Sequence, residues 1–164
     1  YQAASFHADD CAGCGNHAPR RTLLMIYVDT SVIVPLLTVE PKTQGVTAWY
    51  AGLRDTPASS DWLLTEFSSA ISIKLRTGQI NEATAKRVRK EFELLVNGGL
   101  RIVPVSRDAF TQAAVMVRRH DSGLRSGDSL HLAVALELGA SHMATLDGTL
   151  AANAKHNGLE LVEY

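Results

Sequence analysis

The sequence predicts an α/β fold built on a largely parallel sheet. Short apolar, strand-like runs alternate with longer segments of helical periodicity, which is the pattern of strand–helix–strand units. Helical segments outweigh the strands, and crossover connections of this kind place successive strands parallel to each other. We therefore expect a layered fold of a few short parallel strands and more abundant helices.

Length and composition limit the class of protein. The 164 residues suit one compact domain, and 46% hydrophobic with 20% charged residues excludes global disorder. The formal net charge of −1 provides no overall attraction to nucleic acid or anionic lipid, so nucleic-acid binding would depend on local charges. No apolar run reaches the ~20 residues that span a bilayer, and no stretch resembles a secretory signal. We expect a cytoplasmic protein without membrane contact.

The first 24 residues differ from the rest of the chain. They are rich in Ala, His, Asp and Gly, lack regular periodicity, and are followed by Met25 and an apolar run. We expect residues 1–24 to be a disordered, non-native leader or tag, and residues 25–164 to form the domain. An alternative hypothesis is a zinc site, because the segment holds four residues of tetrahedral ligand types, His7, Cys11, Cys14 and His17.

The first predicted strand covers residues 26–28, an apolar run that ends at Asp29. A short helix is expected over 31–37, interrupted or redirected by Pro35. Pro41, a residue type favoured in the first turn, begins a second helix that extends to about residue 53. Residues 56–59 are a weaker strand prediction.

The central part of the chain predicts two long helices, a strand and a further helix. Asp61 is expected to cap a helix that stops at Gly78, and Asn81 to cap a helix that ends near residue 97. Residues 100–105 form the next predicted strand. After it, Ser106 is expected to cap a helix that reaches about residue 120.

The last part of the chain continues the alternation. Ser126 is expected to cap a helix that ends at Gly139, and residues 141–146 form a strand that leads directly to Asp147. A short helix to Asn157 and a final strand over 159–162 complete the predicted domain.

Two acidic side chains stand where a parallel α/β sheet places its functional groups, and two more acids lie on helices. Asp29 and Asp147 each follow an apolar strand directly, at the carboxyl end where parallel sheets carry their sites. Glu66 borders the apolar stripe of its helix, and Asp128 lies in the first turn of another. Each acid alone has a simpler explanation: a helix cap for the first two, a helix-dipole partner for Asp128 and a boundary residue that reaches water for Glu66.

Convergence of these acids at one sheet edge would give them a common role. Gathered carboxylates repel one another strongly unless cations lie between them. Carboxylate oxygens are the ligands that Mg²⁺ and Mn²⁺ prefer, and two such ions about 4 Å apart can activate a water and stabilise the leaving oxygen in phosphodiester cleavage. If the four acids do meet at one edge, they would form a site suited to divalent metal ions and to this chemistry.

Four motifs appear in a fixed order along residues 25–164. They are Tyr27-Val28-Asp29-Thr30-Ser31, Thr65-Glu66-Phe67-Ser68-Ser69-Ala70, Leu124-Arg125-Ser126-Gly127-Asp128-Ser129-Leu130-His131-Leu132-Ala133 and Ala144-Thr145-Leu146-Asp147. In order and spacing they resemble the motifs of PIN-domain ribonucleases of the VapC family, the toxins of type II VapBC toxin–antitoxin pairs. The third motif is the most distinctive of the set.

The resemblance implies a three-layer α/β/α sandwich around a twisted, largely parallel sheet of four to five short strands. It implies an endoribonuclease that hydrolyses RNA with a metal-activated water and leaves 5′-phosphate and 3′-hydroxyl ends. It also implies a VapB-type antitoxin as partner and a homodimer. The implied catalytic site holds Mg²⁺ or Mn²⁺ on four carboxylates, with the first and third as the firmest direct ligands: Asp29, Glu66, Asp128 and Asp147.

Other polar residues have supporting roles in this hypothesis. Ser31 and Thr145 are expected to hold carboxylates in place, and Arg125, three residues before the third acid, is expected to contact an RNA phosphate. His131, one turn after that acid, is interpreted as structural. A cluster of cations on one helix is either a solvated face or a grip on RNA phosphates: Lys86, Arg87, Arg89 and Lys90.

Other functions fit the sequence less well. A haloacid-dehalogenase-type phosphatase needs a second acid two residues after the first, where Ser31 stands, and no Gly-rich phosphate loop is present. A PIN nuclease of RNA processing stays open as an alternative. So does a non-catalytic module that captures a basic peptide in the acidic pocket. Partner binding would use an apolar groove that involves Trp49, Tyr50, Trp62 and Leu63.

Overall fold

The computed structural model describes residues 24–164 and has a five-stranded sheet in which every neighbouring pair is parallel. The strand order is β3-β2-β1-β4-β5. The expected leader, apart from Leu24, and the alternative zinc ligands His7, Cys11, Cys14 and His17 lie outside the described residues. The strands are β1 (Ile26–Val28), β2 (Ala58–Ser60), β3 (Arg101–Val103), β4 (His142–Ala144) and β5 (Glu160–Leu161).

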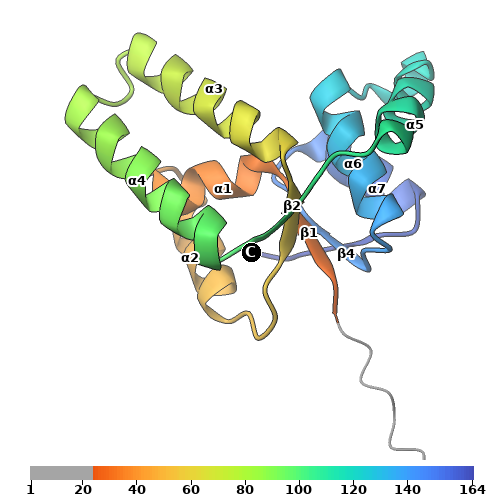
Figure 1. The fold of residues 1–164 in the computed structure, drawn as a ribbon, viewed down its shortest axis with the longest axis horizontal. Coiled ribbons are helices and arrows are strands. Elements are labelled where there is room, and N and C mark those ends of the chain that lie inside the picture. The colour runs from red at the N-terminus through yellow and green to blue at the C-terminus, as the bar shows by residue number, and fades with distance from the viewer. Residues whose placement is uncertain (1–23) are drawn as a thin grey trace, which may run out of the picture.

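Two groups of helices cover the two faces of this sheet (Figure 1). The first group, α1 to α4, packs on the side chains of Ile26 and Val28, and the second, α5 to α7, packs on that of Tyr27, because side chains alternate along a strand. The predicted three-layer α/β/α sandwich is thereby confirmed. The helices are α1 (Thr30–Leu37), α2 (Thr43–Ala51), α3 (Trp62–Arg76), α4 (Glu82–Gly98), α5 (Arg107–Val117), α6 (Ser126–Glu137) and α7 (Gly148–His156), with a short 3₁₀ turn η1 (His120–Ser122).

The strand order creates a topological switch point beside β1. The chain passes from β1 to β2 and β3 on one side, then crosses back to β4 on the other. The backbone N–H of Asp29 donates to the carbonyl of Ala144 over 3.1 Å, so the ends of β1 and β4 are joined. Ligand sites of open α/β sheets lie at such points, outside the carboxyl ends of the strands.

The predicted elements are all present, and except for β1 most have shifted ends. Asn81 and Ser106 cap their helices as expected, each accepting a backbone N–H with its side chain. The prediction that Ser126 caps α6 is wrong, because Arg125 has the extended cap conformation and Ser126 is already helical. Asp61 stands before α3 but forms no side-chain cap, since its own backbone is helical. The helix after Ser106 ends three residues short of the predicted end, at Val117.

The apolar groove predicted from Trp49, Tyr50, Trp62 and Leu63 cannot include all four residues. Leu63 is completely buried in the core and therefore cannot contact a partner, and Trp49 packs edge-on against Tyr164 with ring centroids 5.5 Å apart. Tyr50 donates to the carbonyl of Gly99 over 2.7 Å. Among residues 24–164, no helix is both long enough and apolar enough to cross a membrane.

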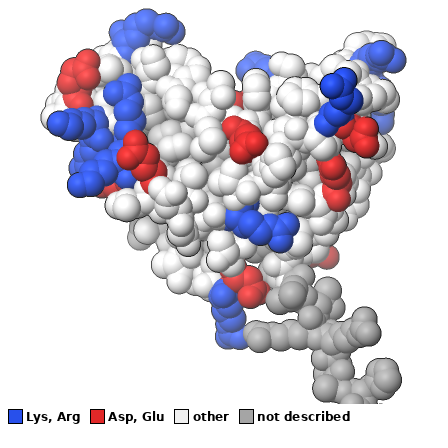
Figure 2. Space-filling view, in the orientation of Figure 1, with Lys and Arg blue, Asp and Glu red and all other residues white. Residues whose placement is uncertain are grey.

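The predicted cation cluster on α4 is exposed to solvent. Arg87 forms an ion pair with Glu91 on the next turn, with 2.7 Å between Nη1 and the carboxylate. Figure 2 shows Lys and Arg side chains gathered over the α3–α4 end of the molecule, beside the indentation that separates it from α5 and α6. Any attraction to nucleic acid is therefore local, as the small net charge requires.

Candidate active site at the carboxyl edge of the sheet

Asp29 follows β1 and is held rigidly by its neighbours. Its Oδ1 accepts from the backbone N–H of Ser31 over 2.9 Å and from the Ser31 hydroxyl over 2.7 Å, while Oδ2 accepts from the Thr145 hydroxyl over 2.8 Å. The residue is 3% exposed, and this burial raises its pKa; nearby His131 and the two hydroxyls oppose the shift without cancelling it. Asp29 is thus both the cap of α1 and a fixed acid at the sheet edge.

The loop after β4 is tied to the start of α1. The Ser31 hydroxyl accepts from the backbone N–H of Leu146 over 2.7 Å, and the Thr145 hydroxyl accepts from that of Asp147 over 3.0 Å. Asp147 in turn caps α7, since its Oδ1 accepts from the N–H of Leu150 over 2.7 Å. The two strand-end acids therefore share one hydrogen-bonded loop system.

Glu66 reaches the same edge from α3. Its Oε2 accepts from the Thr30 hydroxyl over 2.6 Å and lies 2.8 Å from Nε2 of His131. Burial alone raises the pKa of Glu66, but His131 and Thr30 together outweigh burial, so that the pKa is lowered overall and the group stays ionised. Trp62 lies close enough to contribute to this lowering, although its buried Nε1 has no hydrogen-bond partner in the described part of the chain.

Asp128 lies in the first turn of α6. Its Oδ2 accepts from the backbone N–H of Arg125 over a long 3.4 Å. Burial raises the pKa of Asp128 most, and the negative charges of Asp147 and Glu66 raise it further. These three acids therefore repel one another across the edge of the sheet. The side chain of Arg125 is exposed at the start of the same helix.

The described residues form no closed cage for a cation, since no three Asp, Glu, His or Cys side chains among them converge on a point. The donor chemistry is nevertheless that of a hard divalent ion. Three carboxylate oxygens, Glu66 Oε1, Asp128 Oδ1 and Asp147 Oδ2, receive no hydrogen bond from residues 24–164. Free oxygens on mutually repelling carboxylates fit Mg²⁺ or Mn²⁺.

Comparison with known families agrees with this geometry. Residues 26–162 match the PIN domain family, which is most of the chain and includes all four acids. The chain belongs to the PIN domain family. The resemblance predicted from the four motifs is confirmed at this level. A comparison with curated protein sequences found no match.

Solved structures share the PIN fold at low sequence identity. VapC20 of Mycobacterium tuberculosis, described as a Sarcin-Ricin loop cleaving toxin, has a TM-score of 0.64 and 21% identity, over 78% of this chain and 94% of that one. FitAcB from Neisseria gonorrhoeae has a TM-score of 0.64 and 20% identity, over 85% and 97%. A toxin–antitoxin complex from Klebsiella pneumoniae has a TM-score of 0.56 and 14% identity, over 84% and 96%. At such identities the likeness shows the fold.

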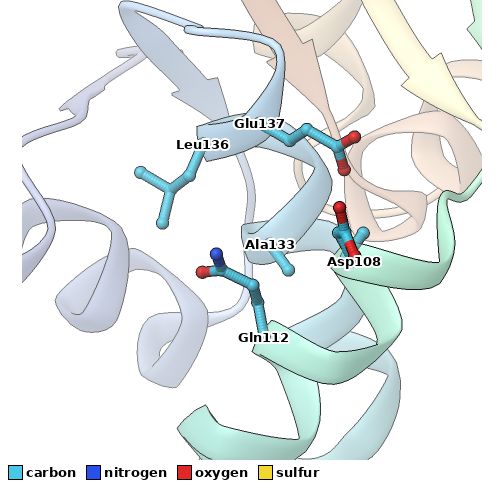
Figure 3. A pocket seen from close by; sticks show the side chains of 6 residues that line it. Asp108, Gln112, Ala133, Leu136 and Glu137 are labelled. Carbon is cyan, nitrogen blue, oxygen red and sulfur yellow. The ribbon is translucent and has the colours of Figure 1, made fainter.

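One sizeable cavity of this PIN domain lies away from the acids. It has a volume of about 290 Å³ between α5 and α6, and Figure 3 shows Asp108 and Glu137 facing each other across it. The Ser106 hydroxyl donates to Glu137 over 2.7 Å. None of the four acids at the carboxyl edge lines this cavity, so we do not assign it to their site.

Sequence reasoning did not predict what holds Glu66 in place. His131 was interpreted as structural, and no role was given to Thr30 or Gly127. A Cβ atom added to Gly127 would overlap Glu66 Oε1, so these two residues touch where α3 and α6 cross. One sequence signal was available, because His131 follows Asp128 by three residues and such side chains share a helix face.

Proposed function

We propose that this PIN domain is a Mg²⁺- or Mn²⁺-dependent endoribonuclease, the toxin of a type II toxin–antitoxin pair that acts in the cytoplasm. The observation that carries the proposal is the placement of Asp29, Glu66, Asp128 and Asp147, from four different elements, at the switch-point edge of a PIN fold. Buried or mutually repelling carboxylates are costly without a cation, which supports a metal-binding role over a merely structural one.

Each acid has a distinct part in the proposal. Asp29 is the fixed ligand, because three hydrogen bonds orient its carboxylate and two of them come from the hydroxyls of Ser31 and Thr145. Asp128, Asp147 and Glu66 each have one carboxylate oxygen that receives no hydrogen bond from residues 24–164 and could bind the ion. A divalent ion bound there would supply an activated water and charge stabilisation for the leaving oxygen.

In the proposed reaction one phosphodiester bond of the RNA is hydrolysed while cationic side chains bind the strand. The water oxygen bonds to phosphorus, the bond from phosphorus to the 3′-oxygen breaks, and that oxygen leaves as a hydroxyl while the phosphate stays on the 5′ side. Arg125 is exposed at the start of α6, which supports the proposal that its guanidinium contacts a phosphate of the bound strand. Cations on α4 lie on the opposite side of the indentation from α6 and could contact other phosphates of the strand.

We also propose a VapB-type antitoxin as partner and a homodimer as the active assembly. Support for the antitoxin comes from the structures of similar fold, among which is a toxin–antitoxin complex. An antitoxin that places an Arg or Lys among these carboxylates would compete with metal. Light scattering of the purified chain, alone and with its antitoxin, measures both assemblies.

Cleavage of total bacterial RNA tests the proposed function. Purified wild type is compared in Mg²⁺, Mn²⁺ and EDTA with Asp29→Asn and Asp128→Asn. Discrete fragments that need metal and are absent with both variants support the nuclease. Equal cleavage by the variants, or no cleavage by folded wild type free of antitoxin, overturns it and favours the module that binds a basic peptide.

A further inference from the structure

We propose that His131 is a positioning residue that, together with Thr30, fixes one oxygen of Glu66 so that the other faces the catalytic edge. This inference rests on the proposed function, in which Glu66 belongs to the acidic site. The resemblance to PIN-domain ribonucleases assigned no role in the site to either His131 or Thr30.

Glu66 is held at one oxygen only. Oε2 accepts from Thr30 over 2.6 Å and lies 2.8 Å from Nε2 of His131, whereas no residue from 24 to 164 donates a hydrogen bond to Oε1. A carboxylate oxygen has two lone-pair positions, so two donors saturate Oε2. The free coordination capacity of Glu66 therefore lies on Oε1, which shares the space beside Gly127 with the Nε1 of Trp62.

The direction of the histidine hydrogen bond follows from Glu66. An ionised carboxylate only accepts, so Nε2 of His131 must carry the hydrogen. The same nitrogen lies 3.2 Å from the Thr30 hydroxyl oxygen, which makes a compact triangle of Thr30, His131 and Glu66. Charge-assisted hydrogen bonds of this kind are stronger than neutral ones and resist rotation of the carboxylate.

The second ring nitrogen of His131, Nδ1, also has a buried partner. Its Nδ1 lies 2.9 Å from the hydroxyl of Tyr27, which donates to the hydroxyl of Ser60 over 2.9 Å. Both Tyr27 and Ser60 are fully buried in strands β1 and β2, and His131 is 1% exposed. The imidazole ring therefore has a fixed position between the sheet and Glu66.

Gly127 completes the orientation of Glu66. Its Cα lies against Oε1, where a Cβ would overlap that oxygen. Gly127 directly precedes Asp128 in α6. The Oε1 of Glu66 is therefore directed to the first turn of α6, beside Asp128. The negative charge of Glu66 raises the pKa of Asp128.

Two substitutions at one position separate the two hydrogen bonds of His131. In His131→Gln the side-chain amide reaches the position of Nε2 and keeps a donor for Glu66. In His131→Asn the shorter amide stands near Nδ1, which keeps the Tyr27 contact and removes the donor to Glu66. A positioning role predicts that Asn lowers kcat for RNA cleavage at least tenfold with KM little changed, and that Gln restores most of kcat.

Mn²⁺ affinity provides a readout that does not depend on RNA cleavage. Electron paramagnetic resonance titration of the RNA-free protein should show about tenfold weaker Mn²⁺ binding for His131→Asn than for His131→Gln. Thr30→Val removes the second donor from a partly exposed site, so it covers the case in which a His131 variant fails to fold. It should weaken Mn²⁺ binding in the same direction.

The matched control is a second His–Glu pair outside the site. His142 Nε2 lies 3.0 Å from Glu160 Oε2, at the opposite, amino ends of β4 and β5, so His142→Asn should leave kcat and Mn²⁺ affinity unchanged. A double-mutant cycle adds a direct test of coupling. In a Glu66→Gln background, His131→Asn should cause little further loss.

The outcomes separate this inference from the proposed function. If wild type does not cleave RNA, the proposed function fails, and the Mn²⁺ titration alone decides the inference. If Glu66→Gln reduces cleavage while His131→Asn and Thr30→Val match wild type in kcat and Mn²⁺ affinity, the positioning role is overturned and the function stands. Equal losses for His131→Asn and His131→Gln, additive with Glu66→Gln, also overturn it.

Discussion

Replacement of Gly127 by alanine tests the packing of Glu66 against α6. The added Cβ overlaps Glu66 Oε1, and Glu66 cannot move away without breaking a hydrogen bond from Thr30 or His131. A hydrogen bond to a charged group contributes about 1.5–3 kcal/mol, and alanine in place of glycine in a helix returns about 0.5–1 kcal/mol. The net expectation is a loss of about 1–2 kcal/mol in the free energy of unfolding.

Gly98→Ala is the control for helix propensity. Gly98 is the last residue of α4, and its added Cβ would meet nothing within 4 Å, so this variant should gain up to about 1 kcal/mol. The two variants should differ by about 1 M in the urea midpoint of unfolding. Gly127→Ala should also cleave RNA more slowly, and Gly98→Ala at the wild-type rate. Equal stability and full activity in Gly127→Ala would refute the reasoning.

Three further predictions concern metal, pH and RNA. Mn²⁺ at 100 times its dissociation constant should raise the free energy of unfolding by about 2.7 kcal/mol in wild type and not in Asp128→Asn, whereas an equal rise in both contradicts metal binding by this acid. Because burial, then Asp147 and Glu66, raise the pKa of Asp128 above its ordinary 3.8, the folded state holds this proton more tightly than the unfolded chain. In EDTA, the free energy of unfolding of wild type should therefore fall as pH rises from the pKa of Asp128 in the unfolded chain through its pKa in the folded protein. Urea unfolding at several pH values should show a shallower fall for Asp128→Asn. Parallel curves for the two proteins would contradict this prediction. Arg125→Ala should raise KM for RNA with kcat little changed and lower the salt slope of binding by about 1, and an unchanged slope would exclude a phosphate contact.

The sequence predicted the order of elements better than their ends. β1 was predicted with its correct bounds because it is a run of three buried apolar residues that ends at an acid. β2 was only a weak prediction, since its buried residues Ser59 and Ser60 are polar. Their hydroxyls bond to the Val28 carbonyl and to Tyr27, and such distant partners leave no periodic pattern in the sequence.

The positions of the site acids were also predictable to different degrees. Asp29 and Asp147 follow strands, so the parallel-sheet rule alone directs attention to them. Their simpler explanation as helix caps is correct too, since one carboxylate can accept a backbone N–H and still face the edge. The contacts of Glu66 depend on where α3 crosses α6, which no local pattern encodes. The contacts of His131 and Gly127 with Glu66 therefore emerged only from the structure.

Analysis of the RNA product ends tests the central claim most directly. Wild type and Asp29→Asn are incubated with a defined RNA in Mn²⁺, and the termini of the fragments are identified by mass spectrometry. Hydrolysis by water at the four-carboxylate site predicts 5′-phosphate and 3′-hydroxyl ends, formed by wild type and lost in the variant. Fragments that end in 2′,3′-cyclic phosphate, or that form equally with Asp29→Asn, would contradict the account.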